Sequence, residues 1–129
     1  MEMTITFPKG TRVNAQFGPY EIPTDQPLES GGTATAPDPF SLFLASIGTC
    51  TGIYVLRFCQ ERNLPTTDLH LSLTAKWNDK KNLLEAIQIT IHTDDSFPEK
   101  YKNALIKVAK LCTVKRQLEQ PPEITISVS

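Results

Sequence analysis

Residues 38–63, DPFSLFLASIGTCTGIYVLRFCQERN, decide the fold because they predict one long helix that is apolar on nearly every side. Asp38 can accept hydrogen bonds from exposed backbone N–H groups at the start, and Pro39 suits the first helical position, where no N–H is needed. The helix is expected to end near Asn63 and Pro65. A helix with apolar side chains all around it is typically surrounded by protein. A membrane span is the competing interpretation, but polar residues interrupt the run, which favours burial in a core or a subunit interface.

The residues before this helix predict short strands. Residues 4–7, 12–17 and 20–22 are separated by turns that contain proline and glycine, which indicates a small antiparallel meander. Residues 23–37 are rich in proline, glycine and serine and predict a loop that could cover a site.

The residues after the helix alternate in polarity. Residues 69–77 and 87–92 place apolar and polar side chains in turn, which predicts a long hairpin with one apolar face. A second helix is expected from residue 96, where Ser96 and Glu99 have the spacing of a capping box. Residues 113–118 predict a further helical turn, and residues 124–128 predict a last strand.

The sequence therefore predicts a single α+β domain over residues 1–129. The expected order is β-β-β-α-β-β-α-β, an antiparallel sheet with two main helices packed on one face. A helix that is apolar all round leaves uncovered surface in so short a chain, which favours a partner subunit.

Composition excludes several functional classes. A formal charge of -1, with 40% hydrophobic and 21% charged residues, gives no general attraction to nucleic acid or to an anionic membrane. The N-terminus shows no targeting segment, so we expect a cytoplasmic protein whose partners are small molecules or protein. Three cysteines cannot all pair within one chain, which argues against a framework of structural disulfides. The sequence has no C-x-x-C motif, so a zinc site is not indicated. We expect no metal and no cofactor.

Cys50 is the first candidate for reactivity. It lies between Gly48 and Gly52 in the middle of the predicted helix, and glycines there cost about 1 kcal/mol each relative to alanine. Close approach by another helix or by a ligand would compensate for that cost. The alternative interpretation is an inert cysteine in tight packing.

Cys112 is the second candidate. It lies where the second helix should end, and if a new turn starts at Thr113, its amide groups and the charges of Lys115 and Arg116 would favour a thiolate. The alternative is a core cysteine. Cys59 follows Cys50 by nine residues, which places it on roughly the opposite face of the helix, and we assign it to packing.

Two stretches carry a resemblance to a known family. Residues 39–51, PFSLFLASIGTCT, and residues 112–118, CTVKRQL, resemble the two cysteine motifs of the OsmC/Ohr family, named for osmotically inducible protein C and organic hydroperoxide resistance. The order of predicted elements agrees over essentially the whole chain.

The resemblance implies an intertwined homodimer that reduces organic hydroperoxides at sites in the subunit interface. Cys50 would attack the peroxide and become a sulfenic acid, Cys112 would capture it as a disulfide, and an external thiol would reset the protein. We expect the substrate pocket to be lined by four residues, chosen for their apolar character: Phe40, Phe43, Ile47 and Tyr54.

The sequence departs from the family at one position. Classical members carry a glutamate at the start of the first helix, near Phe40 or Ser41 here, which works with an arginine from the N-terminal strands. This chain has no acid at either position, and Arg12 is the candidate for the cation. An acid could replace the glutamate only if the loop folds back; the candidates are Glu21, Asp25, Glu29 and Asp38.

Two other functions use the same residues. A thiol–disulfide exchanger or sulfur carrier would cycle Cys50 and Cys112 without responding to hydroperoxides. A binding module of the same fold would hold an apolar small molecule between subunits and depend little on Cys112.

Overall fold

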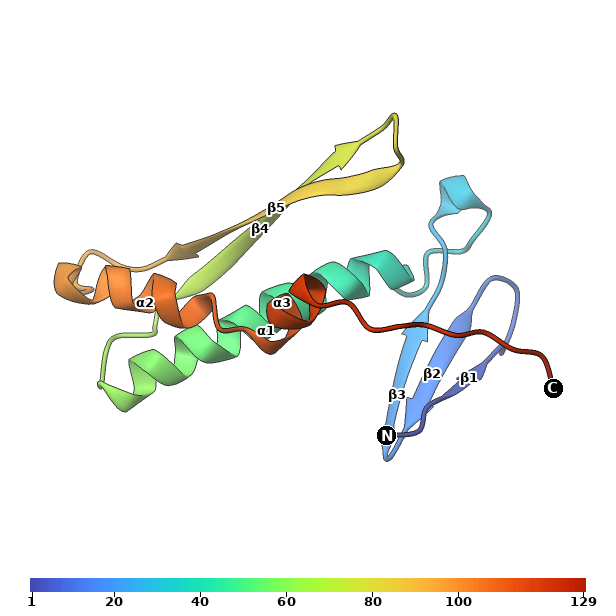
Figure 1. The fold of residues 1–129 in the computed structure, drawn as a ribbon, viewed down its shortest axis with the longest axis horizontal. Coiled ribbons are helices and arrows are strands. Elements are labelled where there is room, and N and C mark those ends of the chain that lie inside the picture. Colours follow the sequence, from blue (N-terminus) through green and yellow to red (C-terminus); the bar gives the residue numbers. More distant parts are fainter. The chain divides into compact units, whose positions relative to one another are not determined.

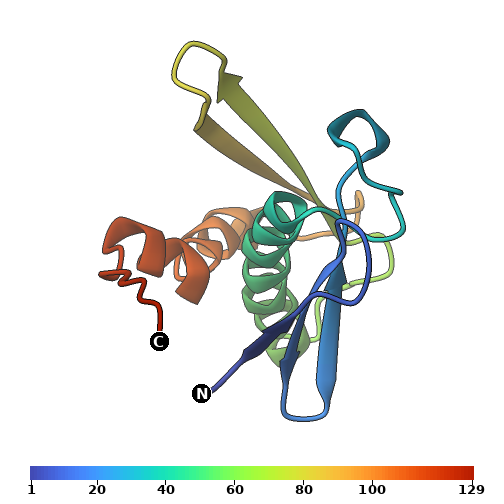
Figure 2. The same ribbon diagram turned by 90° about the vertical axis from the view of Figure 1, so that its right-hand side faces the viewer.

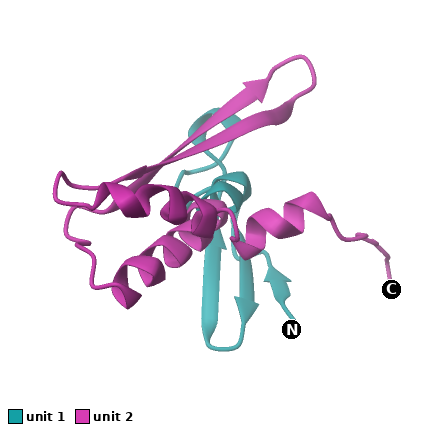
Figure 3. Ribbon diagram, turned by 60° about the vertical axis from the view of Figure 1, so that its left-hand side comes forward, with its two compact units in different colours: residues 1–45 teal, residues 46–129 magenta.

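The computed structural model describes all 129 residues and shows an α+β chain of antiparallel strands and helices (Figure 1, Figure 2). The chain divides into two compact units, residues 1–45 and residues 46–129 (Figure 3). The predicted fold class is confirmed.

The first unit contains the predicted meander. Strands β1 (Thr4–Thr6), β2 (Val13–Phe17) and β3 (Tyr20–Thr24) pair antiparallel in sequence order. The turn between β2 and β3 contains Gly18 with φ of 51°, a backbone conformation that glycine adopts without steric cost. Phe17 and Tyr20 face each other across this turn with ring centroids 5.6 Å apart.

The loop after β3 is organised around the carboxylate of Asp25, which is fully buried. Its Oδ1 accepts from the Thr11 hydroxyl at 2.6 Å and the Gln26 N–H at 2.8 Å. Its Oδ2 accepts from the hydroxyls of Thr33 and Thr35, at 2.6 and 2.7 Å, and from the Thr35 N–H at 3.1 Å. Four of these hydrogen bonds, those from the three threonine hydroxyls and the Thr35 N–H, hold the pKa of Asp25 well below its usual range, the Thr11 hydroxyl contributing most. The carboxylate therefore fixes the loop, which includes the short 3-10 helix η1 (Leu28–Ser30).

Helix α1 (Pro39–Glu61) begins in the first unit and continues through the second. Asp38 caps it as predicted: its Oδ1 accepts from the N–H groups of Phe40 at 3.0 Å and Ser41 at 3.1 Å. By length and composition α1 could cross a membrane, with a mean hydropathy of 1.6 over its most apolar window. Only 28% of that window is buried within the chain, so much of its apolar surface is uncovered.

The second unit contains the predicted hairpin. Strands β4 (His70–Asn78) and β5 (Leu83–His92) pair antiparallel, with an irregularity between Lys76 and Trp77. Near the free end of the hairpin, Trp77 is 45% exposed. His70 and His92 pair across the strands and stack, with ring centroids 4.5 Å apart.

The remaining helices are η2 (Glu99–Tyr101), α2 (Lys102–Ala109) and α3 (Thr113–Glu119). The predicted capping box is wrong, because the Ser96 hydroxyl donates to Asp94 at 2.6 Å and no side chain caps η2. The short turn predicted after Cys112 forms as α3.

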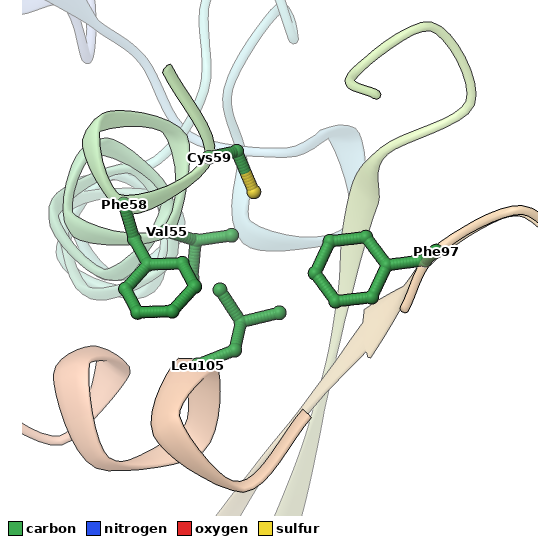
Figure 4. Packing of buried hydrophobic residues seen from close by; sticks show 5 residues of the cluster. All are labelled: Val55, Phe58, Cys59, Phe97 and Leu105. Atoms are coloured by element: carbon green, nitrogen blue, oxygen red, sulfur yellow. The ribbon is translucent and has the colours of Figure 1, made fainter. Parts of the chain in front are cut away.

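The core of the second unit joins α1, α2 and the segment that follows β5. Its buried members point toward one another in Figure 4: Val55, Phe58, Cys59, Phe97 and Leu105. Leu71 of β4 and Ile91 of β5 pack against this cluster, so the helices cover one face of the hairpin as predicted. The Arg62 guanidinium lies 3.8 Å from the centre of the Phe58 ring and closes the cluster at one end.

The predicted last strand is wrong. Residues 120–129 leave α3 as a single segment that joins no sheet (Figure 1). Three alternating apolar side chains on it are almost completely exposed, Ile124 at 79%, Ile126 at 93% and Val128 at 99%. Alternation gives a segment the pattern of a strand, but a strand forms only where another backbone supplies hydrogen bonds. The strands form two separate sheets, one of three strands and one of two, rather than the one sheet expected.

Candidate functional site

The second unit brings Cys50 and Cys112 together. Cys50 lies in the middle of α1 and is partly exposed, whereas Cys112 immediately precedes α3 and is fully buried. The two side chains interact by a hydrogen bond between their sulfur groups. Residues 62 positions apart in sequence thus form one dithiol site, as the sequence predicted.

The pKa of Cys112 is lowered although the side chain is buried. Burial is the largest influence and on its own would raise the pKa. Four hydrogen bonds outweigh it: those of the Lys115 N–H, the Cys50 thiol, the Thr51 hydroxyl and the Val114 N–H. Each stabilises a thiolate by placing a donor against the sulfur. The backbone of the turn after Cys112 therefore favours a thiolate, as the sequence predicted, while the charges of Lys115 and Arg116 are not among the causes.

Thr51 is a site residue that the sequence analysis missed. It is buried, and its hydroxyl donates to the Ile47 carbonyl at 2.8 Å, the bond that a threonine within a helix commonly makes. Because a hydroxyl has one proton, Thr51 can donate a hydrogen bond to this carbonyl or to the Cys112 sulfur, but not to both at once. Its position next to Cys50, as a polar residue within an apolar helix, was the signal that could have identified it.

Tyr54 connects α1 to the turn that carries Cys112. Its hydroxyl shares a hydrogen bond of 3.0 Å with the Thr113 hydroxyl, at the residue directly after Cys112. This bond helps to hold the two cysteine-bearing segments next to each other.

The second unit has an apolar cavity of about 430 Å³ whose wall includes neighbours of the two cysteines but neither cysteine itself. Thr51 and Lys115, which both bond to Cys112, are also part of its wall. The wall is otherwise mostly aliphatic and comes from α1, β5, α2 and α3; its members are Ile47, Thr51, Ile87, Ile89, Ile91, Ile106, Ala109, Lys110, Lys115 and Leu118. A space of this kind can hold a small organic molecule.

The predicted substrate-binding residues have different surroundings. Ile47 lines the cavity, and the Tyr54 hydroxyl bonds to Thr113. Phe40 and Phe43 belong to the first unit, where their ring centroids lie 5.2 Å apart. A role in binding substrate stays a prediction for all four.

Three of the four acids considered as replacements are engaged in the structure of the first unit itself. Glu21 accepts from the Asn14 side chain at 2.9 Å, Asp25 fixes the loop, and Asp38 caps α1. The Ser41 hydroxyl, bonded at 2.6 Å, is the main reason that the pKa of Asp38 is lowered. Arg12 has a buried Nε with no hydrogen-bond partner. The hydrogen bonds of these three acids are thus local, and replacement of the family glutamate by Glu29 stays a prediction.

The other cysteine lies apart from the dithiol. Cys59 is part of the core cluster around Phe58, and burial raises the pKa of its thiol. Its assignment to packing is confirmed. No three histidine, cysteine, aspartate or glutamate side chains gather closely enough to hold a metal ion.

Comparisons with known proteins identify the fold. A structure of an osmotic stress induced and detoxification response protein from Psychrobacter arcticus has a TM-score of 0.75 at 18% identity, over 89% of this chain and 85% of that one. An OsmC-like protein from Mycoplasma pneumoniae has a TM-score of 0.73 at 16% identity, over 93% of this chain and 87% of that one. The organic hydroperoxide resistance protein OhrB of Bacillus subtilis has a TM-score of 0.58 at 14% identity, over 94% and 93%.

These identities are low enough that the likeness establishes the fold alone. No curated protein matches the chain in sequence. The model of the OsmC-like protein family matches residues 31–127, a span that includes the whole dithiol site. With its α+β fold and paired cysteines, the chain belongs to the OsmC-like protein family.

Proposed function

We propose that this protein is a thiol-dependent peroxidase that reduces organic hydroperoxides through Cys50 and Cys112. The observation that carries the proposal is the contact between the two sulfurs, one partly exposed and the other buried among hydrogen-bond donors. A structural homologue, OhrB of Bacillus subtilis, is an organic hydroperoxide resistance protein, which supports the same chemistry.

The reaction needs two thiols and no cofactor. The Cys50 thiolate attacks the distal peroxide oxygen, the O–O bond breaks, and an alcohol leaves while Cys50 becomes a sulfenic acid. Cys112 attacks the sulfenic sulfur, which forms a disulfide and releases water. An external thiol then reduces the disulfide through the more exposed Cys50.

The cavity favours an organic substrate over hydrogen peroxide. Its aliphatic wall stabilises a hydrocarbon group by removing it from water, at about 25 cal/mol per Å² of apolar surface buried, whereas hydrogen peroxide gains nothing from such a wall. We propose that Ile47, with Phe40, Phe43 and Tyr54, contacts that hydrocarbon group, and that Arg12 orients the peroxide.

A direct test is to mix the reduced protein with cumene hydroperoxide in a stopped-flow instrument and to follow thiol loss. We expect loss of two thiols per chain in the wild type and none from Cys112 when Cys50→Ser is mixed. Cys59→Ser is the matched control and should react like the wild type. If the wild type keeps its thiols, or if Cys50→Ser loses them equally, the peroxidase is rejected.

A thiol–disulfide exchanger can be distinguished from a peroxidase by the oxidant with which its cysteines react. An exchanger would oxidise the same pair with glutathione disulfide and leave cumene hydroperoxide unreacted. The peroxidase should react faster with the hydroperoxide than with glutathione disulfide.

The aliphatic cavity favours a second candidate, a module that binds an apolar molecule. Native mass spectrometry of freshly purified protein would detect a retained ligand. A ligand that stays bound in Cys112→Ser, together with thiols that ignore hydroperoxide, would favour this candidate.

We also propose that the protein acts as a homodimer in the cytoplasm, in which a second copy covers α1. Neither glycine beside Cys50 is required by packing within the chain, since a Cβ on Gly52 would meet nothing within 4 Å and one on Gly48 would lie 3.7 Å from Leu73. The exposed alternation of residues 124–128 also has the pattern of a strand that pairs with another chain.

Light scattering after size-exclusion chromatography measures the mass that this dimer predicts. Ile124→Asp combined with Ile126→Asp should shift the protein toward the monomer, because two charges would enter an apolar contact. Thr125→Asp, on the alternate face of the same segment, is the control and should remain dimeric. A monomeric wild type would contradict the proposal.

A further inference from the structure

The aliphatic cavity of the second unit has positive charge on its wall. The hydrocarbon part of the wall is built around five isoleucines from α1, β5 and α2, and two lysines, Lys110 and Lys115, also belong to it. Neither cysteine is part of the wall, so a molecule held in the cavity need not react with the dithiol. The cavity thus combines a large apolar surface with two ammonium-bearing side chains.

The two lysines of the wall differ in their partners. The Lys115 ammonium is paired with Glu119, one turn further along α3. Lys110, at the C-terminal end of α2, is exposed and makes no ion pair with an acid of the chain. One ammonium group of the wall is therefore available to an anion from solution.

The segment that carries both lysines is strongly basic. Residues 100–116 hold six of the 13 lysines and arginines of the chain and no aspartate or glutamate. Glu99 and Glu119, on either side of this segment, pair with Lys102 and Lys115. Because a cleft lined by one sign of charge raises the local concentration of the opposite ion, this segment favours an anionic ligand over a neutral or a cationic one.

The apolar part of the cavity is incompletely covered. Ile106 of α2 and Leu118 of α3 both belong to its wall, and each is about half exposed. An aliphatic chain in the cavity would remove this surface from water, and its own surface as well. A ligand with a hydrocarbon chain and one anionic end would therefore match both parts of the wall.

We propose that the cavity binds an aliphatic carboxylate, with its chain among the isoleucines and its carboxylate at Lys110. The single unpaired ammonium of the wall matches the single negative charge of a carboxylate. The inference goes beyond both candidate functions, neither of which assigns a charged group to the ligand. It also does not depend on the peroxidase, because binding requires no reaction at Cys50 or Cys112.

Isothermal titration calorimetry of the reduced wild type with decanoate tests the binding. Decanoate should bind roughly tenfold more tightly than octanoate, because each of its two extra methylene groups is removed from water. Decylammonium has the same chain with the opposite charge and should bind at least about threefold more weakly than decanoate. The absence of saturable decanoate binding, or equal affinities for decanoate and decylammonium, would overturn the proposal.

Charge reversal at Lys110 tests the position of the carboxylate. Lys110→Glu should invert the preference, so that decylammonium binds more tightly than decanoate. Lys107→Glu is the matched control, because Lys107 is exposed in the last turn of α2 but is not part of the wall. It changes the net charge equally and should keep the preference for decanoate, as should Lys110→Arg.

The comparison of the two glutamate variants decides between the cavity and a general attraction. Equal loss of decanoate binding in Lys110→Glu and Lys107→Glu would mean that the basic segment attracts anions without placing them at Lys110, and this result would reject the proposed site.

Nuclear magnetic resonance of isoleucine methyl groups locates the ligand in the unmodified protein. The Ile89 methyl signal, from the cavity wall, should shift progressively as decanoate is added. The signal of Ile5 in β1, which is not part of the wall, should stay in place. Shifts confined to isoleucines outside the wall would assign decanoate to another surface and contradict the inference.

The results also distinguish this inference from the proposed function. A protein that binds decanoate at Lys110 but keeps its thiols in cumene hydroperoxide would support the carboxylate site and reject the peroxidase. A protein that reduces cumene hydroperoxide but does not bind decanoate would do the reverse.

Discussion

Cys59 and Cys112 are equally buried, each with 0% of its surface exposed, yet the structure shifts the pKa of their thiols in opposite directions. Around Cys59 lie the apolar side chains of the core, such as Val55 and Phe58, and burial raises its pKa. Around Cys112 burial acts in the same sense but hydrogen-bond donors outweigh it.

The difference shows that burial alone does not decide whether a cysteine is inert. What decides it is whether the protein replaces the lost water with donors aimed at the sulfur. The same chain provides both cases, so each cysteine is a control for the other.

Mild oxidation should separate the two cysteines most strongly. We expect diamide to convert nearly all of the reduced protein to a Cys50–Cys112 disulfide, because those sulfurs are in contact, while Cys59 stays a free thiol. Peptide mapping after alkylation would measure both. A disulfide that contains Cys59 in the folded protein would break the comparison.

Serine substitution should reduce the free energy of unfolding by different amounts at Cys59 and Cys112. Cys59→Ser places a hydroxyl among apolar side chains and should reduce the free energy of unfolding by about 1–3 kcal/mol. Cys112→Ser keeps a polar group among donors and should cost less than about 1 kcal/mol. Urea denaturation of both reduced variants provides the values, and an equal cost would contradict the difference in surroundings.

The pH dependence of stability should have opposite sign at the two cysteines. Because the folded pKa of Cys112 is lowered, its contribution is present above the unfolded cysteine pKa of about 8.5 and is lost as pH falls through the folded value. Because the folded pKa of Cys59 is raised, its contribution is present below about pH 8.5 and is lost as pH rises. Between pH 6 and 9, the stability gap between wild type and variant should widen for Cys112→Ser and narrow for Cys59→Ser.

Tyr54→Phe should have the smallest effect. It removes an exposed hydrogen bond to Thr113 and should cost about 0.5 kcal/mol of unfolding free energy. If that bond also positions Cys112, the rate of disulfide formation with diamide should fall slightly, while the oxidation state of Cys59 stays unchanged. A loss of several kcal/mol would mean that Tyr54 has a larger packing role than its contacts indicate.

Local chemistry explains what could be predicted from the sequence. Asp38 and Pro39 begin α1 because capping involves only neighbouring residues, and the alternation of residues 69–92 gave the hairpin for the same reason. The contact between Cys50 and Cys112 joins distant segments, and the sequence suggested it through its resemblance to a family rather than through spacing.

The wrong predictions depended on partners that the sequence does not specify. Residues 124–128 have the pattern of a strand, but no strand within the chain pairs with them. Ser96 and Glu99 have the spacing of a capping box, but the Ser96 hydroxyl donates its hydrogen bond to Asp94 instead. Thr51 was missed because its second partner, Cys112, lies 61 residues away.

Trp77, the single tryptophan of the chain, lies near the free end of the β4–β5 hairpin and is half exposed. Its fluorescence will therefore report the solvent around that end of the hairpin rather than the redox state of the cysteines. A blue shift of its emission with rising protein concentration would show a second molecule arriving at the hairpin, without any added label.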